Sequence, residues 1–375
     1  MKVSVSQQQL AHGLGIVSRA VSSHSTLQVL SNILVATDEG RLRLSATNLE
    51  LGISCWIGAQ IEEEGAVTVP ARTFNDLIGT MPSDGVKLAL DERTQTLNVV
   101  CGSSITDIKG IDAQEFPPMP VPNLENGIEL NVADLKEMIQ QVAFAASADD
   151  ARPVLQGVSM TVEGSEITLA ATDGFRISMR RARLSSPVAK PMSAIIPARA
   201  LNELARVASD GKQTVHMVVP DGRGQVLFHL DDIELVSQLI DGNFPDYKAI
   251  MPQSFKTTTI ISTAAFLKAC KQAEIIAREG NNVVRLSITA GEDGAGEVEI
   301  SAQSEETGSS EVQVDATVTG TDLIVAFNVR YLRELLDVVK SASVALETNA
   351  SNTPGMMRPV GNEDFKHVIM PMHLG

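Results

Sequence analysis

Aromatic residues are scarce in this 375-residue chain, which has one tryptophan, two tyrosines and ten phenylalanines. Hydrophobic residues still make up 43% of the sequence and charged residues 20%, so aliphatic side chains can build sizeable cores. No run of about 18 apolar residues occurs, and therefore no membrane-spanning helix is expected. Residues Met1 to Ser6 lack the apolar segment of a signal peptide, which predicts a cytoplasmic protein.

Cysteine is rare as well. Cys55, Cys101 and Cys270 are far apart and show no CxxC spacing, so neither a disulfide framework nor a zinc site is expected. None of the six histidines stands near both a nucleophile and an orienting carboxylate in the sequence. No HExxH, P-loop or GxGxxG context is present. These absences argue against an enzyme, and no catalytic residue, metal or cofactor is predicted.

What the sequence does contain is one helical pattern that occurs three times. It opens at Val69-Pro70-Ala71-Arg72, Ile196-Pro197-Ala198-Arg199 and Phe327-Asn328-Val329-Arg330, whose arginines are 127 and 131 residues apart. An earlier strand-then-helix pattern, starting near residues 2, 128 and 259, repeats with nearly the same period. A period this long fits a small domain rather than a solenoid unit, so we expect three copies of one domain.

Each copy is expected to contain strand, helix, strands, helix and strands, because short alternating segments separated by turn residues surround the two helical patterns. This order predicts an α+β fold with two helices on one face of antiparallel sheet in each domain. Proline-rich linkers stand at residues 116–122 and 244–252. The predicted domains are therefore residues 1–122, 123–252 and 253–375.

Positive charge is in short supply overall, since the formal net charge is −16, and this alone disfavours nucleic acid as a partner. Its distribution points the other way. The six predicted helices, residues 7–20, 71–81, 132–146, 198–209, 263–278 and 329–340, hold 11 basic and 7 acidic residues. We interpret this as helices that line one basic surface, while acidic sheets face away from it. Such a surface predicts contacts with phosphates that ignore base sequence.

Two other classes of function stay open at this point. The leading alternative is a scaffold or adhesin of three α+β domains, which the missing signal peptide and the positive helices disfavour. A DNA-processing enzyme would need a clustered carboxylate metal site. The acidic pairs Asp149-Asp150 and Asp231-Asp232 are interpreted instead as loop charges.

Several long motifs follow one another along the whole chain: Thr26-Leu27 with Ser31-Asn32-Ile33-Leu34, Val69-Pro70-Ala71-Arg72, residues 171–176, residues 239–247, residues 327–332 and the tail 368–374. They resemble those of the bacterial β sliding clamps, the β subunit of DNA polymerase III. The resemblance implies a non-catalytic processivity factor. It implies a head-to-tail homodimer ring in which twelve helices surround duplex DNA without sequence specificity.

The resemblance also implies the residues of two contact surfaces. Ring closure would join an edge strand of the first domain to the third domain of a second copy, through Thr106, Ile108, Ile275 and Ile276. Weak contacts to DNA would come from Arg19, His24, Arg72, Arg152, Arg199 and Lys248.

A third implied surface is a pocket between the second and third domains that binds short apolar peptides. Its expected partners are the DNA polymerase III catalytic subunit, the clamp loader, and other polymerases and repair proteins that carry clamp-binding motifs. Matching positions are Leu155, Thr172, Gly174, Phe175, Arg176, Ile177, Pro245, Ile250, Asn328, Tyr331, Val360, Ile369, Met370, Pro371 and Met372. Without the resemblance, Met370-Pro371-Met372 would be interpreted as a terminal strand that packs on its own core.

Overall fold

The computed structural model describes residues 1–22, 25–120, 123, 127–209, 214–220, 222 and 224–373. Six α-helices form within these residues, and the paired strands are antiparallel throughout. The predicted α+β class with three repeated units is therefore confirmed.

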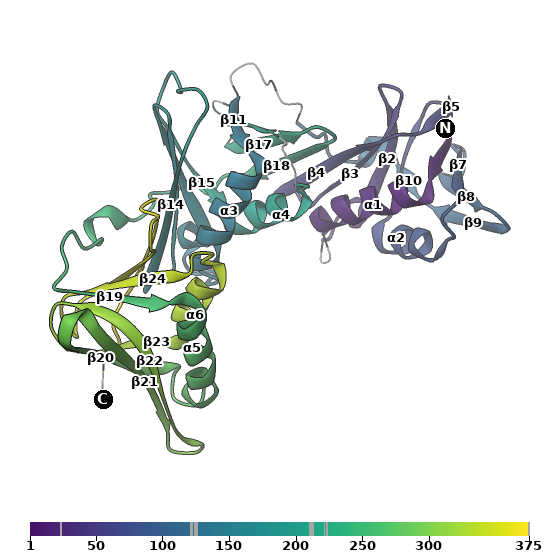
Figure 1. Ribbon diagram of the computed structural model, residues 1–375. Coiled ribbons are helices and arrows are strands. Elements are labelled where there is room, and N and C mark those ends of the chain that lie inside the picture. Colours follow the sequence, from purple (N-terminus) through teal and green to yellow (C-terminus); the bar gives the residue numbers. More distant parts are fainter. Residues whose placement is uncertain are drawn as a thin grey trace. The chain divides into compact units, whose positions relative to one another are not determined.

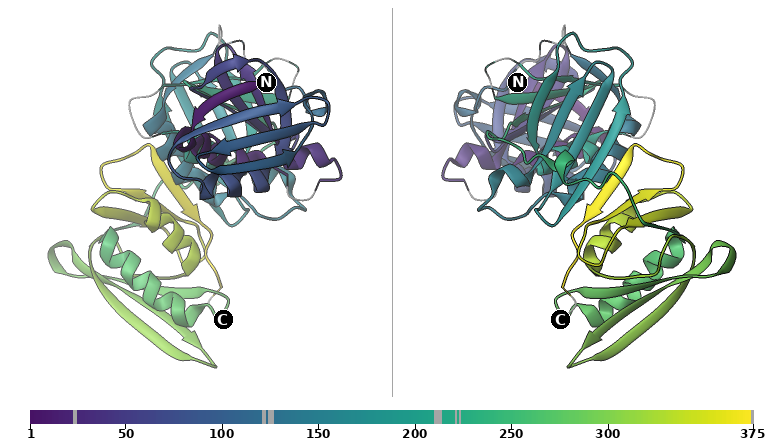
Figure 2. Two further views of the ribbon diagram at one scale, coloured as in Figure 1. Left: turned by 90° about the vertical axis from the view of Figure 1, so that its right-hand side faces the viewer. Right: turned by 90° about the vertical axis from the view of Figure 1, so that its left-hand side faces the viewer.

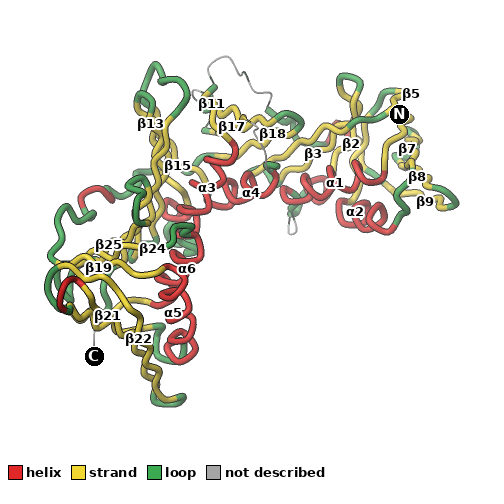
Figure 3. The backbone as a smooth tube through the Cα atoms, viewed as in Figure 1, coloured by secondary structure: helices red, strands yellow, loops and turns green. Residues whose placement is uncertain are grey.

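The order of elements is the same in the three repeats, apart from two short additional strands in the first. Figure 3 shows the helices and strands along the chain. The first repeat consists of β1 (Lys2–Ser6), α1 (Gln7–Val17), β2 (Asn32–Asp38), β3 (Arg41–Thr47), β4 (Leu51–Ile57), β5 (Gln60–Glu63), β6 (Ala66–Pro70), α2 (Ala71–Thr80), β7 (Gly85–Asp91), β8 (Thr96–Cys101), β9 (Ser104–Lys109) and β10 (Ile111–Asp112).

Among the described residues, the other two repeats have no strand at the places of the short β5 and β10, although Met372 forms a single bridge with Ala326 at the place of β10. The second consists of β11 (Ile128–Asn131), α3 (Val132–Val142), β12 (Gly157–Glu163), β13 (Glu166–Thr172), β14 (Arg176–Arg183), β15 (Met192–Pro197), α4 (Ala198–Val207), β16 (Thr214–Val218), β17 (Gln225–Leu230) and β18 (Ile233–Gln238). The third consists of β19 (Thr257–Ser262), α5 (Thr263–Ala277), β20 (Val283–Ala290), β21 (Ala295–Ser304), β22 (Gly308–Thr319), β23 (Leu323–Asn328), α6 (Val329–Val338), β24 (Ser343–Thr348), β25 (Gly355–Pro359) and β26 (Phe365–Ile369).

The helices begin where the sequence predicts them. Asn131, Ser262 and Asn328 cap α3, α5 and α6, because each side-chain oxygen accepts a hydrogen bond from a backbone N–H in the first turn. The predicted segments 7–20 and 132–146 end in 3₁₀ turns, Ser18–Ala20 and Ala143–Ala145, rather than in α-helix.

Consecutive repeats are joined edge to edge through their sheets. β4 of the first repeat pairs with β18 of the second, and β14 of the second pairs with β26 of the third. The two joints have the same register, with Leu51 opposite Ser237 and Arg176 opposite Ile369. Beyond each pairing, one more backbone bond of 2.8 Å forms, from Gln238 to Glu50 and from Met370 to Phe175.

The chain divides into two compact units. One comprises Met1–Ala133 with Glu203–Leu239, and the other comprises Asp134–Asn202 with Ile240–Gly375. Each unit contains one terminal repeat and part of the middle repeat. The domain boundaries predicted after residues 122 and 252 stay a prediction.

The helices of each terminal repeat pack in pairs on their sheets. In the first unit α1 lies beside α2 (Figure 1), and Leu10, Leu14, Phe74 and Ile78 are fully buried. In the second unit α5 lies beside α6 (Figure 2), and both share a core with the strands of the third repeat. Apolar residues at spacings of three and four bury one face of each helix, as the sequence pattern predicts.

Candidate functional site

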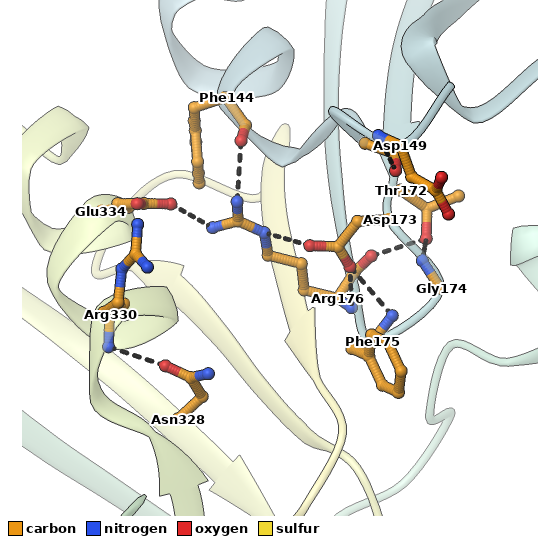
Figure 4. A network of polar contacts seen from close by, with 11 residues as sticks. Phe144, Asp149, Thr172, Asp173, Gly174, Phe175, Arg176, Asn328, Arg330 and Glu334 are labelled. Carbon is orange, nitrogen blue, oxygen red and sulfur yellow. Dashed lines mark hydrogen bonds and ion pairs between the residues drawn. The ribbon is translucent and has the colours of Figure 1, made fainter. Parts of the chain in front are cut away.

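One of the predicted pocket residues of the second unit is a buried arginine, Arg176, whose side chain is 7% exposed and lies at the centre of a polar network (Figure 4). Its Nε lies 3.1 Å from Asp173 Oδ2, and its Nη1 lies 2.6 Å from Glu334 Oε2. Its Nη2 donates to the backbone carbonyl of Phe144 at 2.8 Å. The arginine thereby links the end of α3, the turn before β14, and α6 of the third repeat.

Two aromatic rings cover the same guanidinium group. Its central carbon lies 4.3 Å from the ring centroid of Tyr331 and 5.2 Å from that of Phe144. Cation–π attraction is strong when the cation is withdrawn from water, as it is here. Burial, reinforced by the charge of Asp173, raises the pKa of the Tyr331 hydroxyl, so this group stays neutral.

The turn that carries Arg176 is built by local hydrogen bonds. Thr172 Oγ1 accepts from the N–H of Gly174 at 3.0 Å and donates to the carbonyl of Arg176 at 2.6 Å. Asp173 Oδ1 accepts from the N–H groups of Phe175 and Arg176. Gly174 has a φ of +96°, and a Cβ there would lie 3.1 Å from Nη1 of Arg152, so glycine suits this position.

The first repeat contains the same turn. Thr47 Oγ1 accepts from Leu49 and donates to the carbonyl of Leu51, and Asn48 Oδ1 accepts from Glu50 and Leu51. Leu49 has a φ of +74°, although it is not glycine. Leu51 occupies the place of Arg176, so the first repeat's turn cannot form the charged network.

A buried histidine, His367, lies beneath the arginine network. It is fully buried in β26, opposite Ser178, and its ring stacks on Phe144 at a centroid distance of 5.4 Å. Neither ring nitrogen has a hydrogen-bond partner among the residues that the structure describes. Burial, with a smaller effect from the charge of Arg176, lowers the pKa of His367 to about 3. The ring is therefore neutral at physiological pH.

This shift predicts a pH-dependent stability that a His367→Phe variant will lack. The unfolded chain binds a proton at His367 below about pH 6.5, whereas the folded chain does not until about pH 3, so stability falls as the pH drops through this window. Between pH 7.5 and pH 5, the wild-type chain should lose about 2 kcal/mol more than the variant. Urea denaturation of both proteins across this range is the measurement. Parallel pH profiles would contradict the prediction.

The predicted pocket set contains four large apolar side chains that are exposed: Phe175 (59%), Ile250 (46%), Val360 (43%) and Met370 (38%). They lie close in sequence to better-buried members, since Thr172, Ile177 and Ile369 are buried. Leu155, Asn328, Tyr331, Pro371 and Met372 are half-buried, and Gly174 and Pro245 are exposed.

The C-terminal segment behaves in part as a packed strand. The Met370 N–H donates to the carbonyl of Phe175, and the Met372 N–H donates to the carbonyl of Ala326, both at 2.8 Å. The side chain of Met370 nevertheless stays exposed. These backbone bonds bring the tail beside Phe175 and beside β23, so two parts of the predicted set meet.

The sequence analysis did not predict four residues of this site: Phe144, Asp173, Glu334 and His367. Asp173 lies within the motif of residues 171–176, so the turn could have indicated its position next to Arg176. The other three lie 32, 158 and 191 residues from Arg176, and no local pattern connects them to it.

The side chains predicted to contact DNA differ in their exposure and in their ion pairs. Arg72 is 95% exposed, and Arg199 and Lys248 are exposed as well. Arg19 pairs with Glu203 at 3.2 Å, and Arg152 pairs with Asp149 at 3.2 Å. His24 lies outside the described residues. The predicted role of these side chains in binding DNA stays a prediction.

The predicted ring-closing residues lie on β9 and α5. Ile275 is 57% exposed, whereas Ile276 is half-buried against the core of the third repeat. Ile108 is 4% exposed and packs inside its own repeat, and Thr106 is half-buried. Ile105 on the same strand, which is not one of the predicted ring-closing residues, is 72% exposed.

A threefold α+β repeat whose neighbouring copies join edge to edge defines a clamp-type protein. Family models for the N-terminal, central and C-terminal domains of the DNA polymerase III beta subunit match residues 1–120, 129–246 and 248–373. The beta sliding clamps of Synechococcus elongatus and Bacillus subtilis are each 31% identical to the chain. The alignments cover 100% and 99%, respectively, of both chains.

Solved structures agree with the sequence comparison. The sliding clamp of Bacillus subtilis superposes on the chain with a TM-score of 0.94 at 29% identity, covering 100% of both chains. The chain belongs to the bacterial β sliding clamps, the β subunit family of DNA polymerase III. It is a non-catalytic processivity factor of that polymerase, as the sequence motifs predict.

None of the helices in the described part of the chain has both the length and the apolar character needed to span a bilayer. The same residues contain no group of three or more His, Cys, Asp or Glu side chains that could hold a metal ion.

Proposed function

We propose that two copies of the chain close head to tail into a ring that encircles duplex DNA without sequence specificity. The ring tethers the DNA polymerase III catalytic subunit and other polymerases and repair proteins through short peptides. A clamp loader places it on DNA, and it acts in the cytoplasm. The proposed domains are residues 1–122, 123–252 and 253–375.

One observation carries the ring proposal: the joints between repeats recur, and one more joint of the same kind is left open. β4 and β14 each pair with the last strand of the following repeat. Their counterpart in the third repeat is β22, whose residues Gly308 to Asp315 pair only with β21 among the described strands. The last long strand of the first repeat, β9, is a sheet edge. Joining β22 to β9 of a second copy repeats the existing joint and closes a ring after two chains.

Two exposed isoleucines are suited to this closure. Ile275, on the exposed face of α5, and Ile105, on the exposed face of β9, are large apolar side chains that otherwise face water. We propose that Thr106 and Ile108 hold β9 in its own sheet and that Ile275 and Ile276 pack against that strand in the second copy. Contacts of this kind bury apolar area and stabilise the closed ring.

A ring must hold DNA without fixing it in place. Arg72, Arg199 and Lys248 are exposed cations on separate elements, and none belongs to a built anion site in the described residues. Isolated cations contact phosphates weakly and read no base sequence. We propose that these three residues, with Arg19, His24 and Arg152, let the duplex slide.

Partner peptides dock, in this proposal, beside the arginine network. Phe175, Val360 and Met370 supply exposed apolar area, and adaptable methionine side chains accommodate different anchors. Short peptides with two apolar anchors, such as Gln-Leu-x-Leu-Phe, fit this chemistry. A docked enzyme then stays at a high effective concentration near DNA, which raises processivity.

The test of encirclement is retention on DNA of different topology. After loading on a closed circle, the clamp should stay bound through gel filtration, and linearising the DNA should release it, because a ring slides off a free end. Release can be followed with a fluorescently labelled clamp. Equal loss from circular and linear DNA would overturn the proposal. A linear DNA blocked at both ends by bound protein is the control, and it should retain the clamp.

A further inference from the structure

Each repeat carries an acidic residue at the same place on its second helix. Asp76, Glu203 and Glu334 each follow, by four residues, the arginine that opens the helix: Arg72, Arg199 and Arg330. In two of the three repeats this acid pairs with an arginine of the preceding repeat. Glu203 Oε2 lies 3.2 Å from Arg19 Nη1, and Glu334 Oε2 lies 2.6 Å from Arg176 Nη1.

Both contacts form at the end of the preceding repeat's first helix. Arg19 stands two residues beyond the last residue of α1, Val17. Phe144 stands two residues beyond the last residue of α3, Val142, and its carbonyl holds the arginine that reaches Glu334. In both joints, therefore, the acidic residue of the second helix pairs with an arginine near the end of the preceding repeat's first helix.

The third acid, Asp76, has no preceding repeat in its own chain. Its carboxylate is 70% exposed, and the ion pair that it makes is a distant one of 3.8 Å with Arg72 of the same helix. At the end of the third repeat's first helix stands Arg278, directly after Ala277 of α5. Its side chain is 64% exposed, and its ion pair is with the adjacent Glu279 at 3.6 Å.

We propose that Asp76 of one copy pairs with Arg278 of a second copy at the junction that closes the ring. The inference rests on the proposed head-to-tail dimer and assigns it an ion pair that the sequence motifs do not indicate. It follows from the repeat: the open junction joins the third repeat to the first. It presents an acid at the place on the second helix that pairs in the other two joints, and a cation directly beyond the end of the first helix. A closed dimer contains this pair twice.

The experiment uses charge reversal and mixing of the full-length chains. Asp76→Arg and Arg278→Asp should each weaken dimerisation about tenfold, because like charges then face each other at both junctions. An equimolar mixture of the two variants should dimerise as tightly as the wild-type chain, since both junctions of the mixed ring then contain one arginine and one aspartate. Sedimentation equilibrium over a concentration series measures all four samples.

Matched controls reverse charge elsewhere. Glu64→Arg changes an exposed acid beside β5, at the sheet edge opposite β9, and Arg285→Asp changes an exposed arginine on β20. Neither should alter dimerisation. Unchanged affinity of the single variants, or a mixture that stays as weak as they are, would overturn the ion pair. A wild-type chain that sediments as a monomer would instead overturn the ring, so the two failures are distinguishable.

Discussion

Replacing Arg176 with alanine will destabilise the second unit by about 3 kcal/mol, because the substitution breaks a buried ion-pair network and leaves its partners behind. Glu334 would lose a 2.6 Å partner, the carbonyl of Phe144 would lose its donor, and Tyr331 would lose the cation over its ring. The turn that presents Phe175 would also lose its anchor. Binding of a Gln-Leu-x-Leu-Phe peptide should therefore weaken more than tenfold, since each 1.4 kcal/mol is a factor of ten.

Hydrogen exchange of α6 and β14, together with urea denaturation followed by circular dichroism, will measure the loss of stability. Fluorescence of Trp56 is unsuitable, because this tryptophan lies in the other unit. Arg181→Ala is the matched control: that arginine is more exposed and has longer ion pairs of 3.9 and 3.5 Å, so it should cost less than about 1 kcal/mol. Equal effects of the two substitutions would contradict a special role for Arg176.

The second large effect is expected from Ile275→Asp. If Ile275 is buried when the ring closes, the variant places an unpaired carboxylate in an apolar contact, which costs a few kcal/mol. The closed ring contains this contact twice, so the dissociation constant should rise at least about a thousandfold. At micromolar concentration the variant should sediment near the chain mass of 40.0 kDa, whereas the wild-type chain should sediment at twice that mass.

The control for this variant is Ile324→Asp. Ile324 is a comparably exposed isoleucine, at 41%, on β23 of the same repeat and away from β22 and α5. It should leave the dimer intact. Thermal unfolding of both variants will establish that the monomer is folded. An Ile275→Asp variant that keeps the dimer mass would remove α5 from the proposed junction.

The sequence predicted the parts of this protein that depend on local periodicity. Apolar spacings of three and four located the six helices to within a few residues, and alternating residues located the hairpins. A capping residue such as Asn131 acts within one turn, so it is also a local feature of the sequence. Helix ends were less predictable, because the last turns at Ala20 and Ala145 are 3₁₀ rather than α.

The arginine network could not be predicted in the same way. Arg176 and Asp173 are three residues apart, but Glu334 is 158 residues away and His367 lies on the last strand. No spacing rule relates residues at such separations, since the pairing of β14 with β26 and the position of α6 beside Arg176 bring them together. The resemblance named Arg176 among many pocket positions, yet nothing in the sequence distinguished it as the residue that links three elements.

The amino-acid sequence by itself determined a thrice-repeated α+β unit, the place of each helix and the lack of catalytic or metal-binding patterns, because these depend on neighbours within a few residues. The tertiary structure alone decided which charges meet: Arg19 with Glu203, and Arg176 with Glu334. The reason is physical. An ion pair forms only where backbone pairing and helix packing bring two distant side chains within about 4 Å, and sequence spacing carries no such distance.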